Sequence, residues 1–181
     1  LLLASGADIN QADECGATPL FIACCFWRRS VVELLLDRGA NINQSSDNGA
    51  TPLWIACENG DRDVADLLLA RGADINQADS DGRTPLSISC EKGHLAISEL
   101  LMSSNKFKGY TPEHLKAIIT SCAHGSHAGR ANAVSFYIIA YRCYKQLQSI
   151  DPSYIPDDRA STFIDHGQAQ QERQTHTFLS L

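Results

Sequence analysis

The phrase GATPLFIAC (Gly16–Cys24) recurs 33 residues later as GATPLWIAC (Gly49–Cys57), and again as GRTPLSISC (Gly82–Cys90). Each copy contains a threonine followed by a proline. A threonine side chain accepts a hydrogen bond from the unpaired backbone N–H groups at the start of a helix, and proline suits the first helical position because no N–H is needed there. The phrase therefore predicts a short helix that begins at the proline of each copy.

A second phrase recurs in the same register: SGADINQAD (Ser5–Asp13), RGANINQSS (Arg38–Ser46) and RGADINQAD (Arg71–Asp79). Between the two phrases, apolar residues recur at positions i, i+3 and i+4, which predicts a second helix with one buried face. The triplets are Val31, Leu34 and Leu35; Val64, Leu67 and Leu68; and Ile97, Leu100 and Leu101. Helices of only about eight to ten residues are not stable alone in water, so each unit must be stabilised by its neighbours.

The 33-residue period, the TPL phrase and the G-A-D/N-I-N phrase resemble those of ankyrin repeats. The resemblance covers residues 1 to about 104. It implies an all-α solenoid of stacked helix-turn-helix units with finger-like β-turns. We expect the end of a truncated repeat at 1–15, full repeats at 16–48 and 49–81, and a repeat with a degenerate end at 82–108. The opening residues, LLL, fall in mid-pattern and suggest a piece of a longer protein.

The sequence departs from the family pattern after the TPL phrase. The usual histidine is replaced by Phe21, Trp54 and Ser87, which predicts the loss of a polar contact. The two aromatic residues lie one repeat apart, so stacking of Phe21 on Trp54 is an alternative use of the position.

The repeat pattern stops after Met102, and the remaining chain is expected to end the solenoid. Threonine and proline at 111–112 predict a helix to about residue 122, and a second helix is expected from about 131 to 148. Because a solenoid needs a soluble terminal element, we predict that residues 109–150 form a helical cap. The polar residues of 151–181 predict a flexible tail. If Leu181 is the native terminus, the last residues are a further candidate ligand for a peptide-binding domain.

The charge is acidic and uneven, with a net value of -6. Residues 1–108 hold 9 lysines and arginines against 15 carboxylates, whereas residues 109–181 hold 6 of each. An acidic repeat region without a basic stripe disfavours nucleic acid and anionic membranes as partners. The most apolar run, Ala133–Tyr144, is too short to span a bilayer. We therefore expect another protein as the partner, with no small-molecule substrate.

The seven cysteines do not suggest disulfides. Cys24, Cys57 and Cys90 share one repeat position, and equivalent positions of stacked helices lie too far apart for a bond, so we expect packed, free thiols. Free thiols favour a reducing intracellular compartment, the cytoplasm or else the nucleus. One cluster resembles metal ligands, but it lacks a second paired motif, so we interpret it as a loop and expect no metal or cofactor. Its members are His114, Cys122, His124 and His127.

The family resemblance implies a concave surface that binds other proteins, with contacts on the finger turns and the concave end of each first helix. The matching positions are Glu14, Cys15, Ala17, Cys25, Phe26 and Arg38; Asp47, Asn48, Ala50, Glu58, Asn59 and Arg71; and Ser80, Asp81, Arg83, Glu91 and Lys92. Because aromatic residues and arginines anchor interfaces, we place the centre of binding at Phe26, Trp27, Arg28 and Arg29.

Trp27 lies where the next two repeats have a helix-ending glycine, Gly60 and Gly93. A non-glycine residue in the left-handed conformation costs about 1–2 kcal/mol, so Trp27 either reshapes its turn or is tolerated at that cost. Two hypotheses follow: Phe26 and Trp27 contact a partner, or their rings fold onto the neighbouring truncated repeat.

No nucleophile elbow, phosphate loop or HExxH motif is present, so we predict a non-catalytic protein-binding module. One alternative is the targeting arm of a larger enzyme, such as a ubiquitin ligase or a kinase. Another is a purely structural spacer.

Overall fold

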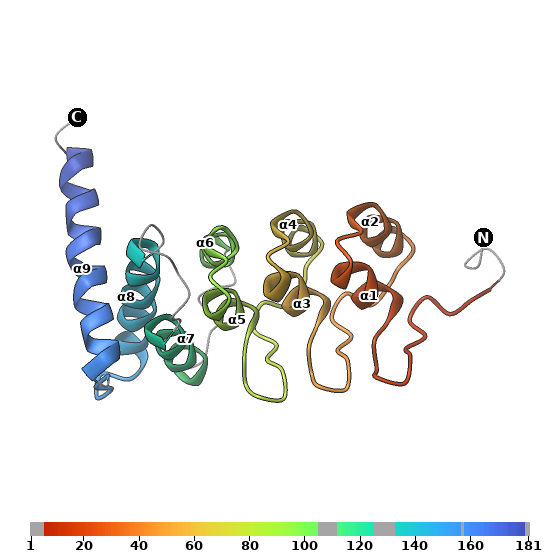
Figure 1. The fold of residues 1–181 in the computed structure, drawn as a ribbon, viewed down its shortest axis with the longest axis horizontal. Coiled ribbons are helices and arrows are strands. Elements are labelled where there is room, and N and C mark those ends of the chain that lie inside the picture. The colour runs from red at the N-terminus through yellow and green to blue at the C-terminus, as the bar shows by residue number, and fades with distance from the viewer. Residues whose placement is uncertain (1–5, 105–111, 125–132, 157, 180–181) are drawn as a thin grey trace. The chain divides into compact units, whose positions relative to one another are not determined.

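A computed structural model describes residues 6–104, 112–124, 133–156 and 158–179 (Figure 1). These residues form helices joined by turns, with no strand among them. The prediction of an all-α helical repeat fold is confirmed. The chain divides into two compact units, Leu1–Pro85 and Leu86–Leu181, and each is described by itself.

The first unit contains two helix pairs. Helices α1 (Pro19–Cys25) and α2 (Arg29–Asp37) form the first pair, and α3 (Pro52–Asn59) and α4 (Arg62–Ala70) form the second. Helix α1 contacts α3, and α2 contacts α4, so equivalent helices of successive repeats are neighbours (Figure 1).

The helices of the first unit begin as the sequence predicts. The Thr18 hydroxyl accepts a hydrogen bond from the Phe21 N–H at 3.2 Å, and the Thr51 hydroxyl accepts one from the Trp54 N–H at 3.1 Å. The Asp61 carboxylate caps α4 in the same way. Helix α2 has no side-chain cap. The threonine-proline phrase therefore fixes where each first helix starts.

Three finger turns, residues 13–17, 46–50 and 79–83, extend from the helices (Figure 1). In each turn the first residue's N–H donates to the last residue's carbonyl at 3.0 Å. Successive turns are also joined: the Asp47 N–H donates to the Cys15 carbonyl at 3.0 Å, and the Ser80 N–H donates to the Asn48 carbonyl at 2.9 Å. The turns form one hydrogen-bonded row.

The asparagines of the G-A-D/N-I-N phrase link one repeat to the next. The Asn10 side-chain oxygen accepts a hydrogen bond from the Asn41 N–H at 2.8 Å. One repeat later, the Asn43 side-chain oxygen accepts one from the Asp74 N–H at 2.9 Å. The phrase therefore recurs because the same bond is made at each junction.

The repeated cysteines are packing residues, as predicted. Cys24, Cys57 and Cys90 are buried, and their thiols are not joined in disulfides. Burial is the main cause that raises the pKa of Cys24 well above its ordinary value. A small, neutral thiol at this position fills the interior as an apolar residue does.

The second unit contains α6 (Leu95–Ser103), α7 (Pro112–His124), α8 (Ala133–Ile150) and α9 (Asp158–Leu179), and α5 (Pro85–Glu91) begins at the boundary of the two units. Helix α8 packs against α6, α7 and α9. Its core includes Leu115, Ile118 and Ile119 of α7 with Ala140, Cys143 and Leu147 of α8. The two helices expected within 109–150 are therefore present, whereas their role as a cap stays a prediction.

The expectation of a flexible tail over 151–181 is wrong for most of its length, because residues 158–179 form α9. Ala160, Ile164 and Gly167 are buried on this helix. These residues follow the i, i+4, i+7 spacing of a helical face. A stripe made mostly of small residues is enough to pack on α8, although the surrounding sequence is polar.

Candidate functional site

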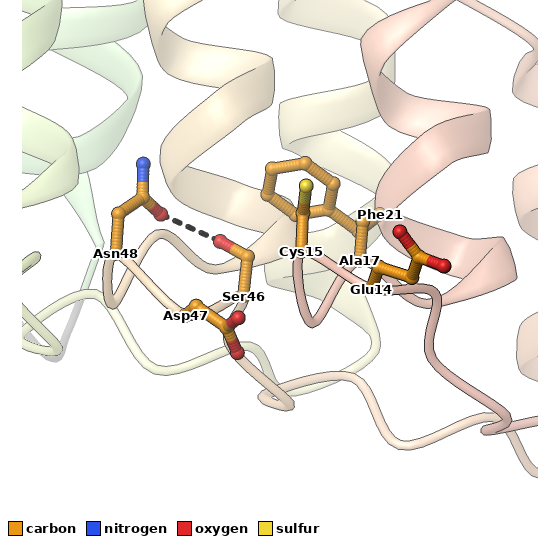
Figure 2. A pocket seen from close by; sticks show the side chains of 7 residues that line it. All are labelled: Glu14, Cys15, Ala17, Phe21, Ser46, Asp47 and Asn48. Carbon is orange, nitrogen blue, oxygen red and sulfur yellow. Dashed lines mark hydrogen bonds between the residues drawn. The ribbon is translucent and has the colours of Figure 1, made fainter.

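A pocket of about 340 Å³ lies between the first two finger turns (Figure 2). Figure 2 shows the Phe21 ring behind the Cys15 thiol, with Glu14 on one side and Asp47 and Asn48 on the other. Ala17 and Ser46 complete the lining. We call this the fingertip pocket. It brings together predicted positions of two different repeats.

The first finger turn is held by one carboxylate. Asp13 Oδ1 accepts hydrogen bonds from the N–H groups of Cys15 and Ala17, both at 2.9 Å. Gly16 adopts a φ of 75°, and a Cβ atom on it would collide with the Asp47 carboxylate and lie 2.7 Å from the Asp47 nitrogen. Glycine is therefore required by both conformation and close approach, and the tips are held rigidly together.

The second finger turn reaches the same shape with other residues. Ser46 replaces the aspartate, and Asn48 Oδ1 accepts the hydrogen bonds of the Ser46 hydroxyl at 2.6 Å and of the Ala50 N–H at 3.1 Å (Figure 2). The Asp47 carboxylate, like that of Glu14 at the equivalent position of the first turn, takes no part in these hydrogen bonds. The pocket therefore has a carboxylate at its edge that does not hold the backbone.

The third finger turn is electrically different from the first two. Arg83 pairs with the buried Asp79 at 2.9 Å and with Asp81 at 2.8 Å. Among the residues that the structure describes, no ion pair involves Glu14 or Asp47. The carboxylates of the third turn are therefore paired with an arginine, whereas the Glu14 and Asp47 carboxylates of the first two turns are in no ion pair among the described residues.

Trp54 recovers a polar contact where the sequence predicts a loss. Its ring is 4% exposed, and its Nε1–H donates to the Arg83 carbonyl at 2.9 Å. The Arg83 guanidinium lies 5.5 Å from the centre of the Trp54 ring. The indole is thus bound to the next finger turn through both its N–H and its face.

The predicted aromatic centre lies at the end of α1. Phe26 is 65% exposed and Trp27 is 62% exposed. Trp27 adopts a φ of 59°, the left-handed conformation that Gly60 adopts one repeat later at 80°. The backbone therefore keeps the left-handed conformation of the helix-ending glycine, although the residue is a tryptophan. We call the exposed pair Phe26 and Trp27 the aromatic turn.

Two side-chain hydrogen bonds join the residues on either side of the aromatic turn to the second repeat. The Asn59 side-chain amide donates to the Cys25 carbonyl at 3.3 Å, and Arg29 Nη1 donates to the Asp63 carbonyl at 3.0 Å. Arg28 is exposed. Arg29 and Asn59, predicted as contact residues, thus also join the two repeats.

The other predicted positions are dispersed. Arg38 and Arg71 cap the C-terminal ends of α2 and α4, and Arg71 pairs with Asp37 at 2.8 Å. Glu91 and Lys92 lie in the second unit. None of these four lines the fingertip pocket.

The cluster of His114, Cys122, His124 and His127, for which no metal is expected, lies largely outside the described residues: the side chain of His114 is described, and those of Cys122, His124 and His127 are not. Among the residues described, no group of three or more histidine, cysteine or acidic side chains is placed to hold a metal ion.

Burial raises the pKa of the Cys25 thiol, with Glu58 as a second cause.

Sequence reasoning missed Phe21 and Ser46 as parts of the site. The sequence comparison relates Phe21 only to the family histidine that it replaces, whereas its ring forms a wall of the fingertip pocket. The signal was available: Phe21 and Cys25 share a helix face because they are four residues apart, and Cys25 was already a predicted contact position.

A family model described as ankyrin repeats (3 copies) matches residues 1–79. This span includes the fingertip pocket and the aromatic turn. No curated protein matches the chain. Within the described part of the chain, none of the helices combines the length and the apolar character needed to cross a membrane.

Proposed function

Because a family model described as ankyrin repeats matches residues 1–79, and such repeats are in general non-catalytic modules of protein–protein interaction, we propose that the chain is a scaffold or adaptor that binds a partner protein through its first unit. The partner contacts the aromatic turn and the fingertip pocket. Binding requires no reaction and no cofactor.

The exposure of the aromatic turn is the observation that carries this proposal. Phe26 and Trp27 are adjacent large residues, 65% and 62% exposed, and Trp27 lies where the next repeat has Gly60. Exposed aromatic residues contribute strongly when an interface covers them. The left-handed conformation of Trp27 is also costly, by about 1–2 kcal/mol, so a tryptophan there is unfavourable for folding alone.

The preformed surface favours protein recognition. The finger turns are joined by backbone hydrogen bonds, and the residues on either side of the aromatic turn are joined to the second repeat by hydrogen bonds from the Asn59 side chain to the Cys25 carbonyl and from the Arg29 side chain to the Asp63 carbonyl. A surface that is already ordered loses little conformational entropy on binding. The net charge of -6 supports a protein partner rather than nucleic acid or an anionic membrane, and the buried thiols, which form no disulfides in the described part of the chain, support an intracellular compartment.

The substitution Trp27→Gly tests the proposal. Glycine adopts the required conformation without strain, so we expect the free energy of unfolding to change by no more than about 1 kcal/mol. Peptides selected with the full chain from a random display library should bind the variant at least about tenfold more weakly, as fluorescence anisotropy can measure.

Ile155→Ser is the matched control, because Ile155 is another exposed apolar side chain, located between α8 and α9. Its loss should leave peptide binding unchanged. If Trp27→Gly lowered the melting temperature while peptide affinity stayed the same, the aromatic turn would be a packing feature. If the selection yielded no binding peptide, the proposal of a protein-binding module would itself fail.

A further inference from the structure

We infer that the fingertip pocket binds an arginine side chain of the partner protein. This inference rests on the proposed function and assigns a chemical identity to one of its contacts. The pocket offers an aromatic wall, Phe21, and two carboxylates, Glu14 and Asp47. Guanidinium groups stack on aromatic faces and pair with carboxylates, so both features suit arginine.

One repeat later, the aromatic ring at the position of Phe21 already has an arginine beside it. Trp54 is equivalent to Phe21, and the third finger turn is equivalent to the second. There, the Arg83 guanidinium lies 5.5 Å from the Trp54 ring centre and pairs with Asp79 and Asp81. An internal arginine thus lies beside the aromatic ring and pairs with two carboxylates of its own turn. Those carboxylates are equivalent to Ser46 and Asn48, so the carboxylates of the fingertip pocket, Glu14 and Asp47, lie at a different position of the turn.

The residue equivalent to Arg83 in the second finger turn is Ala50. A methyl side chain cannot reach the ring or the carboxylates. Between the first two finger turns there are therefore an aromatic ring and two carboxylates of another turn position, while the arginine that lies beside the ring one repeat later is missing from the turn. A partner's arginine would supply it.

The size of the fingertip pocket agrees with this occupant. Its volume, about 340 Å³, lies near the lower end of the roughly 300–1,000 Å³ typical of pockets for small molecules. Such a space suits one long side chain rather than a larger ligand. Because Gly16 and the Asp47 N–H hold the two tips together, the pocket exists before binding.

The charge of the surroundings also favours a cation. The Glu14 and Asp47 side chains are exposed, and no described basic side chain pairs with either. In the third finger turn, by contrast, the carboxylates of Asp79 and Asp81 are already paired with Arg83. A cationic ligand is therefore directed to the junction of the first two turns.

Two capped tripeptides, Gly-Arg-Gly and Gly-citrulline-Gly, test the inference by NMR titration of the isotopically labelled full chain. Citrulline has nearly the shape of arginine but no charge. We expect the arginine peptide to shift the backbone amide signals of Cys15, Ala17 and Asp47, and the citrulline peptide to leave them in place. Equal shifts from both peptides would overturn the assignment.

The double variant Glu14→Gln, Asp47→Asn removes both charges and keeps the shapes. Since exposed ion pairs contribute little each, we expect affinity for the arginine peptide to fall by roughly tenfold. Asp63→Asn with Asp66→Asn removes the same charge from α4 and should change affinity by less than about twofold. An equal loss in the two double variants would show a general charge effect and no pocket.

Ala50→Arg gives a second, independent test, because an arginine there should fill the fingertip pocket from within, as Arg83 does at the next junction. We expect this variant to lose binding of the arginine peptide. A library-selected peptide that binds Trp27→Gly weakly but keeps full affinity for Glu14→Gln, Asp47→Asn would refute the arginine contact and leave the proposed function intact.

Discussion

Gly49 and Gly82 form a matched pair that measures how much the row of finger turns contributes to stability. Both occupy the same place in their turns, with φ angles of 81° and 80°. A Cβ atom on Gly49 would lie 2.9 Å from the Ser80 nitrogen and 3.0 Å from two backbone atoms of Asp79. A Cβ atom on Gly82 would meet nothing within 4 Å. The two glycines differ only in the close approach of a neighbouring turn.

The expected losses follow from this difference. Alanine at either position enters the left-handed conformation at a cost of about 1–2 kcal/mol, reduced by roughly 0.4–1 kcal/mol because alanine is less flexible than glycine in the unfolded chain. For Gly82→Ala we therefore expect a net loss of about 1 kcal/mol. Gly49→Ala must also move the third turn, and losing the hydrogen bond from Ser80 to Asn48 costs about 1 kcal/mol more.

Urea unfolding of the full chain, followed by far-ultraviolet circular dichroism, measures both losses. The fluorescence of Trp54 gives a local readout, because its indole donates to the Arg83 carbonyl in the turn that must move. We expect Gly49→Ala to lose about 2 kcal/mol and to change this fluorescence, and Gly82→Ala to do neither to that extent. Equal losses would refute the idea that backbone contact between turns adds stability.

Further predictions concern packing and the thiols. Leu67→Ala should destabilise the chain by about 2–4 kcal/mol, because Leu67 is 8% exposed. Leu34 lies at the equivalent position one repeat earlier and is 47% exposed, so Leu34→Ala should cost less than about 1 kcal/mol. The urea midpoints of the two variants compare these losses, and equal midpoints would contradict the burial pattern. A maleimide at neutral pH should label the exposed Cys15 in the folded chain and reach the buried Cys24 and Cys143 only on unfolding, as mass spectrometry of digests can show. Because burial raises the pKa of Cys24 above its ordinary 9.0, the thiol ionises first in the unfolded chain; stability should fall as pH rises above about 9, and less so in Cys24→Ala.

Local chemistry explains which features of the fold were predictable from sequence. The threonine-proline pairs mark helix starts through bonds that span three residues, and the cysteines at one repeat position follow the burial of that position. Each of these rules operates within a single repeat. Repetition then shows the same rule several times, which separates it from chance.

The features that sequence reasoning missed depend on partners distant in the chain. Trp54 bonds to Arg83, 29 residues away, and no local pattern connects them. Helix α9 packs through Ala160, Ile164 and Gly167, a stripe too small to be visible in a polar sequence. In both cases the deciding contact is made between elements, and local propensity does not report it.

The same limit applies to the candidate site. Positions transferred from the family located Glu14, Asp47 and Asn48 at the fingertip pocket, but they did not distinguish these residues from Arg38 or Arg71, which lie at the ends of second helices. Family positions indicate where a backbone points. They do not show which side chains converge, because convergence depends on the residues that each repeat happens to carry.

One position shows how repeats of nearly equal backbone acquire different functions. The second and third finger turns share the same closing hydrogen bond at 3.0 Å, yet one ends in Ala50 and the other in Arg83. Arg83 lies beside Trp54 and pairs with two carboxylates of its own turn, so this ring already has a cation beside it. Ala50 cannot reach the equivalent ring of Phe21, and Ser46 and Asn48 replace the two paired carboxylates. A few side chains on the same backbone thus decide whether the space beside the ring is filled from within or remains available to a partner.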